Sequence, residues 1–184
     1  MLENILLWFL LGYLGWKLLV WFCPIRAKVI VRFDPMKQDI ALPDTVISAK
    51  LLPKVALEAL FKARFVQITT AYAADQLSAV RSFMTDAVFQ TFQTAIKNRQ
   101  AQGHHVDYKL VDFKRVDFAE TKGEDMHWVD FETEQINLLK DKEEKIIEGD
   151  PMYLSLVRER WLFKWDEKSG WVLSAVKNVE AHAG

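Results

Sequence analysis

Cysteine and glycine are scarce in this sequence. Its 184 residues include one cysteine, Cys23, so no disulfide can form within the chain, and a reducing compartment is compatible with it. The seven glycines form neither a phosphate-cradling loop nor a G-x-S-x-G nucleophile elbow. Internal repeats and low-complexity tracts are also absent from the sequence. These patterns therefore give no sign of nucleotide-dependent or serine-hydrolase chemistry.

Positive charge is unevenly distributed along the chain. The formal net charge is −1, with 24 lysines and arginines against 25 acids. Residues 1–50 hold six cations and four acids, a net charge of +2, which leaves −3 for the remainder. A mildly acidic domain argues against nonspecific binding of nucleic acid, because such binding neutralises phosphates. The basic segment would instead be attracted to anionic lipid headgroups.

The longest hydrophobic run begins the chain. Asn4 to Cys23 contains one charge, Lys17, and a helix of that length spans about 30 Å, the hydrocarbon thickness of a bilayer. The start MLEN lacks the basic residues of a signal peptide, and no small-residue cleavage site follows the run. Residues 1–25 are therefore predicted to form a retained transmembrane anchor.

The anchor and its exit predict contacts with the membrane interface. Lys17 either extends its ammonium to the headgroups or faces a partner helix or polar cavity. The basic exit favours a cytoplasmic or matrix location for the rest of the chain. The predicted interface residues are Trp8, Trp16, Lys17, Trp21, Arg26, Lys28 and Arg32. We expect a single-pass inner-membrane protein, with residues 26–53 as a basic exit and linker.

Helical periodicity extends over residues 53–102. Apolar residues three and four apart, from Leu57 to Tyr72, make one stripe along a first helix. Asp75 and Thr85 are expected to cap a second and a third helix. Gly103 is expected to end the third helix.

After Gly103 the hydrophobic period changes to two. Apolar and polar residues alternate in four segments, at about residues 106–118, 129–131, 157–165 and 171–175. A change of phase at Val111 predicts a bulge in the first segment. Three helices followed by about four antiparallel strands define an α+β domain, predicted over residues 54–184. One face of the sheet is expected to pack against the helices.

The order of these elements resembles a known domain family. Residues 61–99, FKARFVQITTAYAADQLSAVRSFMTDAVFQTFQTAIKNR, combine an aromatic-rich helix with a helix of the pattern F…F…I..R. Further on come a strand WVDFE, an acidic glycine turn EGD, the sequence ERWLF and the ending GWVL. Over about residues 55–180, this pattern resembles the Tim44-like domain. That family includes the C-terminal domain of a mitochondrial import-motor adaptor, a mitoribosomal protein and membrane-anchored bacterial members.

The resemblance implies a fold and a class of function. It implies a cone-shaped domain like nuclear transport factor two, with helices packed on a curved antiparallel sheet. It also implies binding at membranes rather than chemistry, without a cofactor. The partners implied are inner-membrane lipid and a translocase, a ribosome, a respiratory complex or a DnaK-type chaperone. A long charged helical region like that of the mitochondrial adaptor is not recognisable, so the motor role does not follow.

Two sets of side chains are candidates for binding. The first is apolar, and it either lines a pocket for a lipid tail or an apolar peptide or simply forms the core. Its residues are Phe61, Phe65, Ile68, Tyr72, Phe89, Phe92, Phe131, Trp161 and Phe163. The second is a row of cations, which is either a docking face for an acidic partner or a solvated sheet face. Its residues are Arg158, Arg160 and Lys164.

Catalysis and metal binding find little support in the sequence. By the same resemblance, enzymes of this fold use an aspartate, alone or with a histidine, in a central cavity. The candidates are Asp112, Asp130, His104, His105 and His127. Asp130 alternates with apolar neighbours and should point away from the core, and the adjacent histidines are expected to be exposed. No histidine spacing matches a metal site.

The sequence therefore predicts a non-catalytic, membrane-anchored adaptor that binds protein, in protein translocation or as an accessory subunit of a membrane complex. Two alternatives stay open. One is an assembly component resembling the VirB-eight proteins of type IV secretion, whose domain is periplasmic and whose span follows a longer basic tail. The other is a small-molecule isomerase or dehydratase of the same fold.

Overall fold

The computed structural model describes residue 50, residues 52–119 and residues 123–178. The predicted anchor and nearly all of the linker lie outside this part of the chain, and so do all seven predicted interface residues. Among the described residues, no helix has both the length and the apolar character needed to span a bilayer. The anchor therefore stays a prediction from the sequence.

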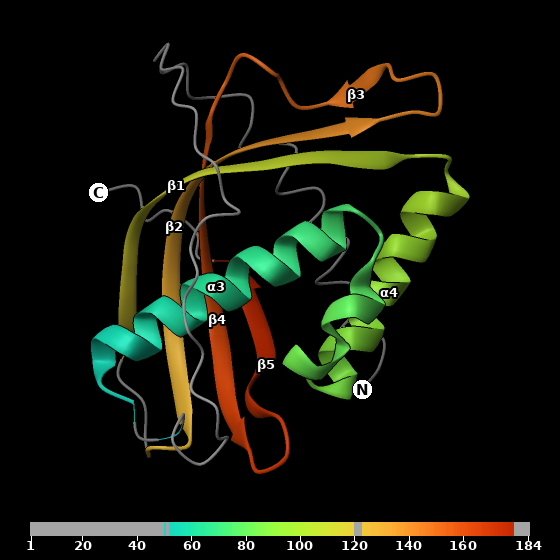
Figure 1. Cartoon of the computed structure of the whole chain (residues 1–184). Helices are drawn as coiled ribbons and strands as arrows, with labels where there is room; N and C mark the ends of the chain where they lie inside the picture. Colours follow the sequence, from blue (N-terminus) through green and yellow to red (C-terminus); the bar gives the residue numbers. More distant parts are fainter. Residues whose placement is uncertain (1–49, 51, 120–122, 179–184) are drawn as a thin grey trace. The chain divides into compact units, whose positions relative to one another are not determined.

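Three helices come first in the described chain (Figure 1). α3 (Lys54–Ala73) begins directly after Pro53, which occupies its N-cap position. η2 (Leu77–Phe83) is a 3₁₀ helix, and α4 (Asp86–Ala101) follows it. Gly103 comes two residues after α4 and has a φ of +70°, a conformation that glycine adopts without strain. The three predicted helices and the stop at Gly103 are confirmed.

The predicted cap at Asp75 is wrong. η2 starts after Gln76, and no side chain caps it. The backbone of Asp75 is left-handed, with a φ of +59°, and its carboxylate accepts hydrogen bonds from Arg99 and, at 2.9 Å, from Gln100 Nε2. These charge-assisted bonds to α4 outcompete a bond to the backbone of η2. Thr85 does occupy the N-cap position of α4, although its hydroxyl makes no capping bond.

Antiparallel strands form a single sheet, and α3 lies across one of its faces (Figure 1). Four strands follow the order β1 (His105–Ala119), β2 (Met126–Lys140), β4 (Ser155–Asp166) and β5 (Gly170–Asn178). A fifth, β3 (Ile146–Glu148), pairs with the end of β2 beyond β4. The sheet thus has one strand more than the four expected, because three residues are too few to show a hydrophobic period.

The predicted bulge in β1 is confirmed. The register of β1 with β2 shifts between Leu110 and Asp112, and again between Phe113 and Arg115. Each shift changes which side chains point to which face, because strand residues alternate with a period of two. Both Leu110 and Phe113 therefore pack against the core, although three residues separate them.

Aromatic rings join α3 to the inner face of the sheet, which is the face turned toward α3. Phe61 stacks on Phe163 with ring centroids 4.2 Å apart. Phe65, one helical turn later, lies 4.7 Å from both Phe131 and Trp161. All five side chains are at most 2% exposed. This layer of rings is the centre of the hydrophobic core, and it positions α3 on the sheet.

Truncating Phe61 should destabilise the whole domain. Phe61→Ala removes a fully buried ring and leaves a cavity, so we expect the free energy of unfolding to fall by about 3–5 kcal/mol. Urea titration followed by tryptophan fluorescence measures this change. Val55→Ala, on the same helix but at a side chain that is 81% exposed, should change stability by less than about 0.5 kcal/mol. Equal effects from the two variants would contradict this packing.

Candidate protein-docking site

Rows of opposite charges cross the outer face of the sheet, which is turned away from α3. Asp117, Asp130, Arg160 and Lys177 lie in register on four adjacent strands. Arg160 binds Asp130 through two hydrogen bonds, from Nε to Oδ1 at 2.5 Å and from Nη2 to Oδ2 at 2.6 Å. Hydrogen bonding to Asp130 raises the pKa of Arg160. Asp130 thus points away from the core, as its alternation predicts.

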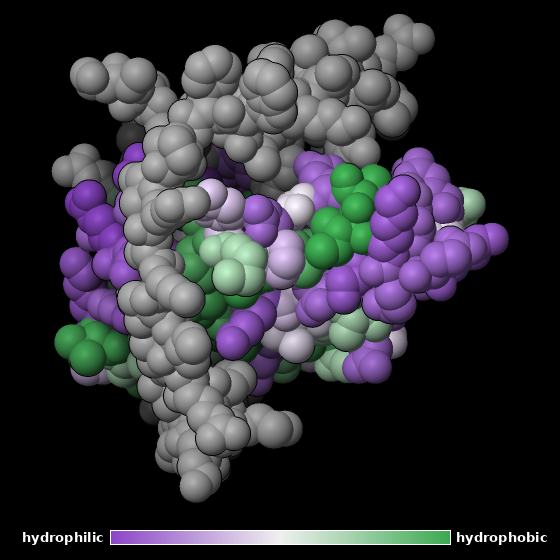
Figure 2. Space-filling view, turned by 90° about the horizontal axis from the view of Figure 1, so that it is seen from above, coloured by the Kyte–Doolittle hydropathy of each residue, from purple (hydrophilic) through white to green (hydrophobic). Residues whose placement is uncertain are grey.

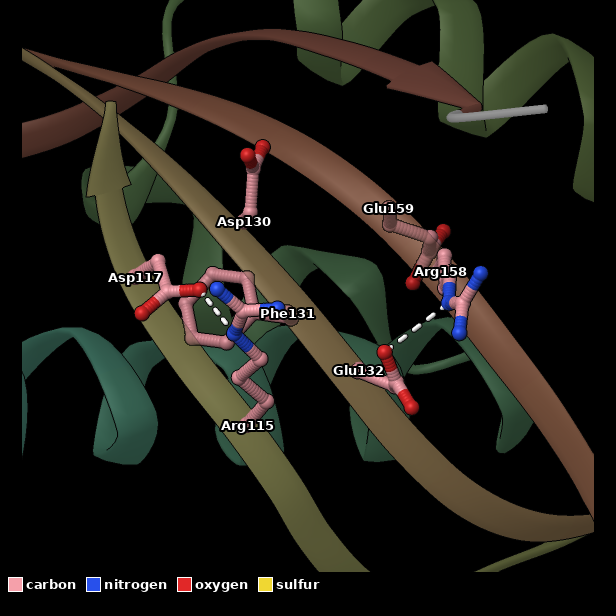
Figure 3. Close-up of a pocket in the computed structure, with 7 residues that line it drawn as sticks. All are labelled: Arg115, Asp117, Asp130, Phe131, Glu132, Arg158 and Glu159. Carbon is pink, nitrogen blue, oxygen red and sulfur yellow. Dashed lines mark hydrogen bonds and ion pairs between the residues drawn. The ribbon is translucent and has the colours of Figure 1, made fainter. Parts of the chain in front are cut away.

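A hollow of about 280 Å³ lies beside this row (Figure 3). Two ion pairs frame it: Arg158 Nε donates to Glu132 Oε2 at 2.8 Å, and Arg115 pairs with Asp117 along β1. The lining residues are Arg115, Asp117, Asp130, Phe131, Glu132, Arg158 and Glu159. Because cations and acids both line the hollow, it offers hydrogen-bond donors and acceptors together.

The three cations of the predicted docking row differ in their surroundings. Arg158 and Arg160 are bound to acids of β2, whereas Lys164 is exposed and makes no ion pair with any residue that the structure describes. Exposed ion pairs contribute about 0–1 kcal/mol each, so the charges of a partner protein can compete for them. Lys164 is the member of the row whose charge is available without such competition.

The predicted pocket residues fall into two groups. Six of them are buried and pack against one another between α3 and the sheet: Phe61, Phe65, Ile68, Phe131, Trp161 and Phe163. The other three are half-buried at α4, where Tyr72 lies 5.2 Å from Phe92 and the guanidinium of Arg81 lies 4.7 Å from the ring of Phe89. Side chains therefore fill the space under α3.

The candidate acids and histidines lie apart. Asp112 shares the outer face with Asp130 and pairs with Lys114. His105 begins β1, where its Nε2 lies 3.2 Å from Glu144 Oε1. Both His105 and the neighbouring His104 are half-buried rather than exposed. Among the described residues, no group of three or more His, Cys, Asp or Glu side chains is arranged to hold a metal ion.

His127 is the candidate that lies on the inner face. Its ring is 4.9 Å from Trp171 and 5.6 Å from Phe118. Burial lowers the pKa of His127, so the imidazole is neutral near pH 7. The neighbours named here are aromatic rings, and neither carries a carboxylate that could orient the imidazole as a general base.

The candidates from the sequence do not include one inward-facing acid, Glu159. It lies on β4 in phase with Trp161 and Phe163, so it belongs to the inner face. Burial raises the pKa of Glu159 to about 7, and the Trp161 indole opposes that shift. The sequence does indicate this orientation of Glu159, because Arg158 and Arg160 point outward and the residue between them must point inward.

A solved structure of a known protein has a similar fold. The intermembrane space region of the chloroplast protein ARC6 superposes with a TM-score of 0.56 at 16% identity, over 71% of this chain and 98% of that one. A putative dehydratase of the NTF2-like family from Streptomyces avermitilis superposes with a TM-score of 0.42 at 13% identity, over 70% and 100%. A search of curated protein sequences finds no match.

The described residues form a small α+β domain with helices on one face of an antiparallel sheet. Residues 55–178 match the sequence profile of the Tim44-like domain. The chain belongs to the Tim44-like domain family, which confirms the resemblance seen in the sequence. Domains of this family are in general non-catalytic adaptors associated with membranes or with protein partners.

Glu159 should make the stability of the domain depend on pH. Its pKa is about 7 when folded, against an ordinary value of 4.5, so the folded state binds more protons between these values. The free energy of unfolding should therefore fall as pH rises from about 4.5 to above 7, by up to about 3 kcal/mol. Urea titrations at pH 5 and pH 8 measure the difference.

Glu159→Gln should remove most of this pH dependence, because an amide stays neutral throughout. Glu167→Gln, at an exposed acid in the turn between β4 and β5, is the matched control and should keep the dependence of the unmodified chain. If the free energy of unfolding depends on pH in the same way for the unmodified chain and for Glu159→Gln, the carboxyl of Glu159 is not desolvated.

Proposed function

We propose that this chain is a membrane-anchored, non-catalytic adaptor whose domain binds a protein partner at an inner membrane. The observation that carries the proposal is the filled inner face. Phe61, Phe65, Phe131, Trp161 and Phe163 occupy the space in which a central cavity would lie. The outer face instead offers charged side chains of both signs over several strands, which suits recognition of a protein surface.

The predicted anchor gives this binding its location. Residues 1–25 would hold the domain next to inner-membrane lipid, and the basic exit would place it on the cytoplasmic or matrix side. Tethering raises the effective concentration of the domain near a membrane-bound partner, so individual contacts can be weak. A role in protein translocation, or as an accessory subunit of a membrane complex, fits this arrangement. The partner would be a translocase, a ribosome, a respiratory complex or a DnaK-type chaperone.

Glu159 favours a second candidate function. An inward carboxyl whose pKa is about 7 is suited to be a general base near neutral pH, as in an isomerase or a dehydratase. A base also needs room for a substrate and a group that orients it. Phe131, opposite Glu159 on β2, and Trp161 beside it on β4 are both almost fully buried in the core. We therefore place the enzyme second.

The location of the domain can be tested with a C-terminal tag on the full-length chain. We expect the protein to sediment with bacterial inner membranes, and the tag to resist added protease in intact spheroplasts but not after lysis. Digestion of the tag in intact spheroplasts would favour the VirB-eight-like arrangement. A full-length protein in the soluble fraction would contradict the proposal.

The docking face can be tested with a photocrosslinking amino acid at one position at a time. Introduced at Lys164 on the outer face, it should give discrete adducts with a partner in membranes that contain the native complex. Introduced at Lys97, an exposed position on α4, it should give few. Equal adducts from the two positions would exclude a specific role for the outer face.

A further inference from the structure

Exposed hydrophobic side chains gather at one end of the sheet, on the β3 arm, which we define as residues 140–156. Six large hydrophobic side chains are exposed in the described part of the chain, and five of them belong to this arm. They are Ile146, Ile147, Met152, Tyr153 and Leu156. Met152 is 76% exposed and Leu156 is 53% exposed. Such clustering marks an interaction surface, whereas scattered exposed residues do not.

The arm is held in place by its own backbone geometry. Gly149 follows β3 with a φ of +94°, and a Cβ there would lie 2.3 Å from the carbonyl oxygen of Asn137. The chain therefore runs close to the backbone of β2 at a position that only glycine allows. Before β3, the Asp141 carboxylate accepts hydrogen bonds at 3.0 Å from the backbone N–H groups of Glu143 and Lys145. The backbone that carries the hydrophobic cluster thus has a defined conformation.

β3 offers a free edge to another strand. It pairs with β2 on one side, and on its other side it has no strand partner among residues 50, 52–119 and 123–178. Free edges normally invite pairing with another chain, and proteins often use them to bind extended peptides by adding a strand. Ile147 is 47% exposed at this strand, so an added strand would also cover apolar surface.

Charge decides between the possible occupants. Residues 140–150 contain three lysines and five acids, a net charge of −2. Lys140 is paired with Asp107 at 2.9 Å and with Glu144 at 3.5 Å, and Lys142 lies 3.6 Å from Glu143. Figure 2, which looks onto this end of the molecule, shows hydrophobic surface beside strongly hydrophilic side chains. An anionic lipid surface and a second copy of the arm would both be repelled, whereas a basic segment would be attracted.

We propose that the β3 arm binds an extended polypeptide segment in which apolar side chains alternate with lysine or arginine, added as a strand along β3. The apolar side chains of the segment contact Ile147 and Met152, and its cations face the acids that flank β3. This inference names the chemistry of one partner of the adaptor, and in that sense it rests on the proposed function.

Binding can be measured with the full-length chain in nanodiscs of zwitterionic lipid. The probe is a short peptide of alternating valine and lysine, and the comparison is a peptide of alternating valine and glutamate. We expect the basic peptide to bind at least about tenfold more tightly, and its affinity to fall as salt is raised. Hydrogen exchange at residues 146–148 should slow when it is bound, as expected for a new strand.

Two pairs of variants locate the site. Ile147→Thr combined with Met152→Gln should weaken binding about tenfold or more, whereas Val55→Thr, at an exposed apolar residue on α3, should not. Glu143→Lys reverses one charge of the arm and should also weaken binding. Glu167→Lys, which makes the same change in the turn between β4 and β5, should leave it unchanged.

Several results would overturn this inference. One is that the acidic peptide binds as tightly as the basic peptide. Another is that the control variants lose as much peptide affinity as the arm variants. A third is self-association of the chain that depends on Ile147. A chain that sits in the membrane with its tag protected but binds no basic peptide would refute the arm site and leave the adaptor function standing. A chain that binds the peptide but is found in the soluble fraction would refute the anchoring instead.

Discussion

The packing of α3 on the inner face of the sheet is the constraint on which the rest of this structure depends. Phe61 and Phe65 each contact rings from more than one strand, so one helix fixes the positions of β2, β4 and β5 together. Filling this face with aromatic rings has a consequence for function. Because the inner face is occupied, the binding surfaces that we propose are the outer face and the end of the sheet that carries the β3 arm.

The inner face is apolar at one end and polar at the other. Thr133 and Gln135 are 1% and 5% exposed, and Thr133 Oγ1 has no hydrogen-bond partner among the described residues. Both lie on β2 opposite the start of β4, close to Glu159 and next to the β3 arm. Burying polar groups costs free energy unless they are hydrogen-bonded, so the core is less apolar at the end next to the proposed peptide site.

Most of the fold follows from periodicity, and the exceptions have physical reasons. The helices, the long strands and the bulge at Val111 each carry enough residues to show a period of 3.6 or 2. β3 does not, and the role of Asp75 depends on Arg99, a residue 24 positions later. Glu159 could have been found from its phase between two arginines. The raised pKa of Glu159 could not, because it depends on how deeply the folded chain buries the carboxyl.

The predicted point of attachment and the proposed peptide site lie at opposite ends of the sheet. Lys50, where the described chain begins, lies 2.7 Å from Asp125, directly before β2, and its ammonium is 5.9 Å from the ring of Trp165 near the end of β4. The β3 arm lies at the opposite end of β2, a strand of 15 residues whose extended length is about 50 Å. A partner segment bound at the arm would therefore be held away from the point of attachment, and the same domain could serve partners of different size at one membrane.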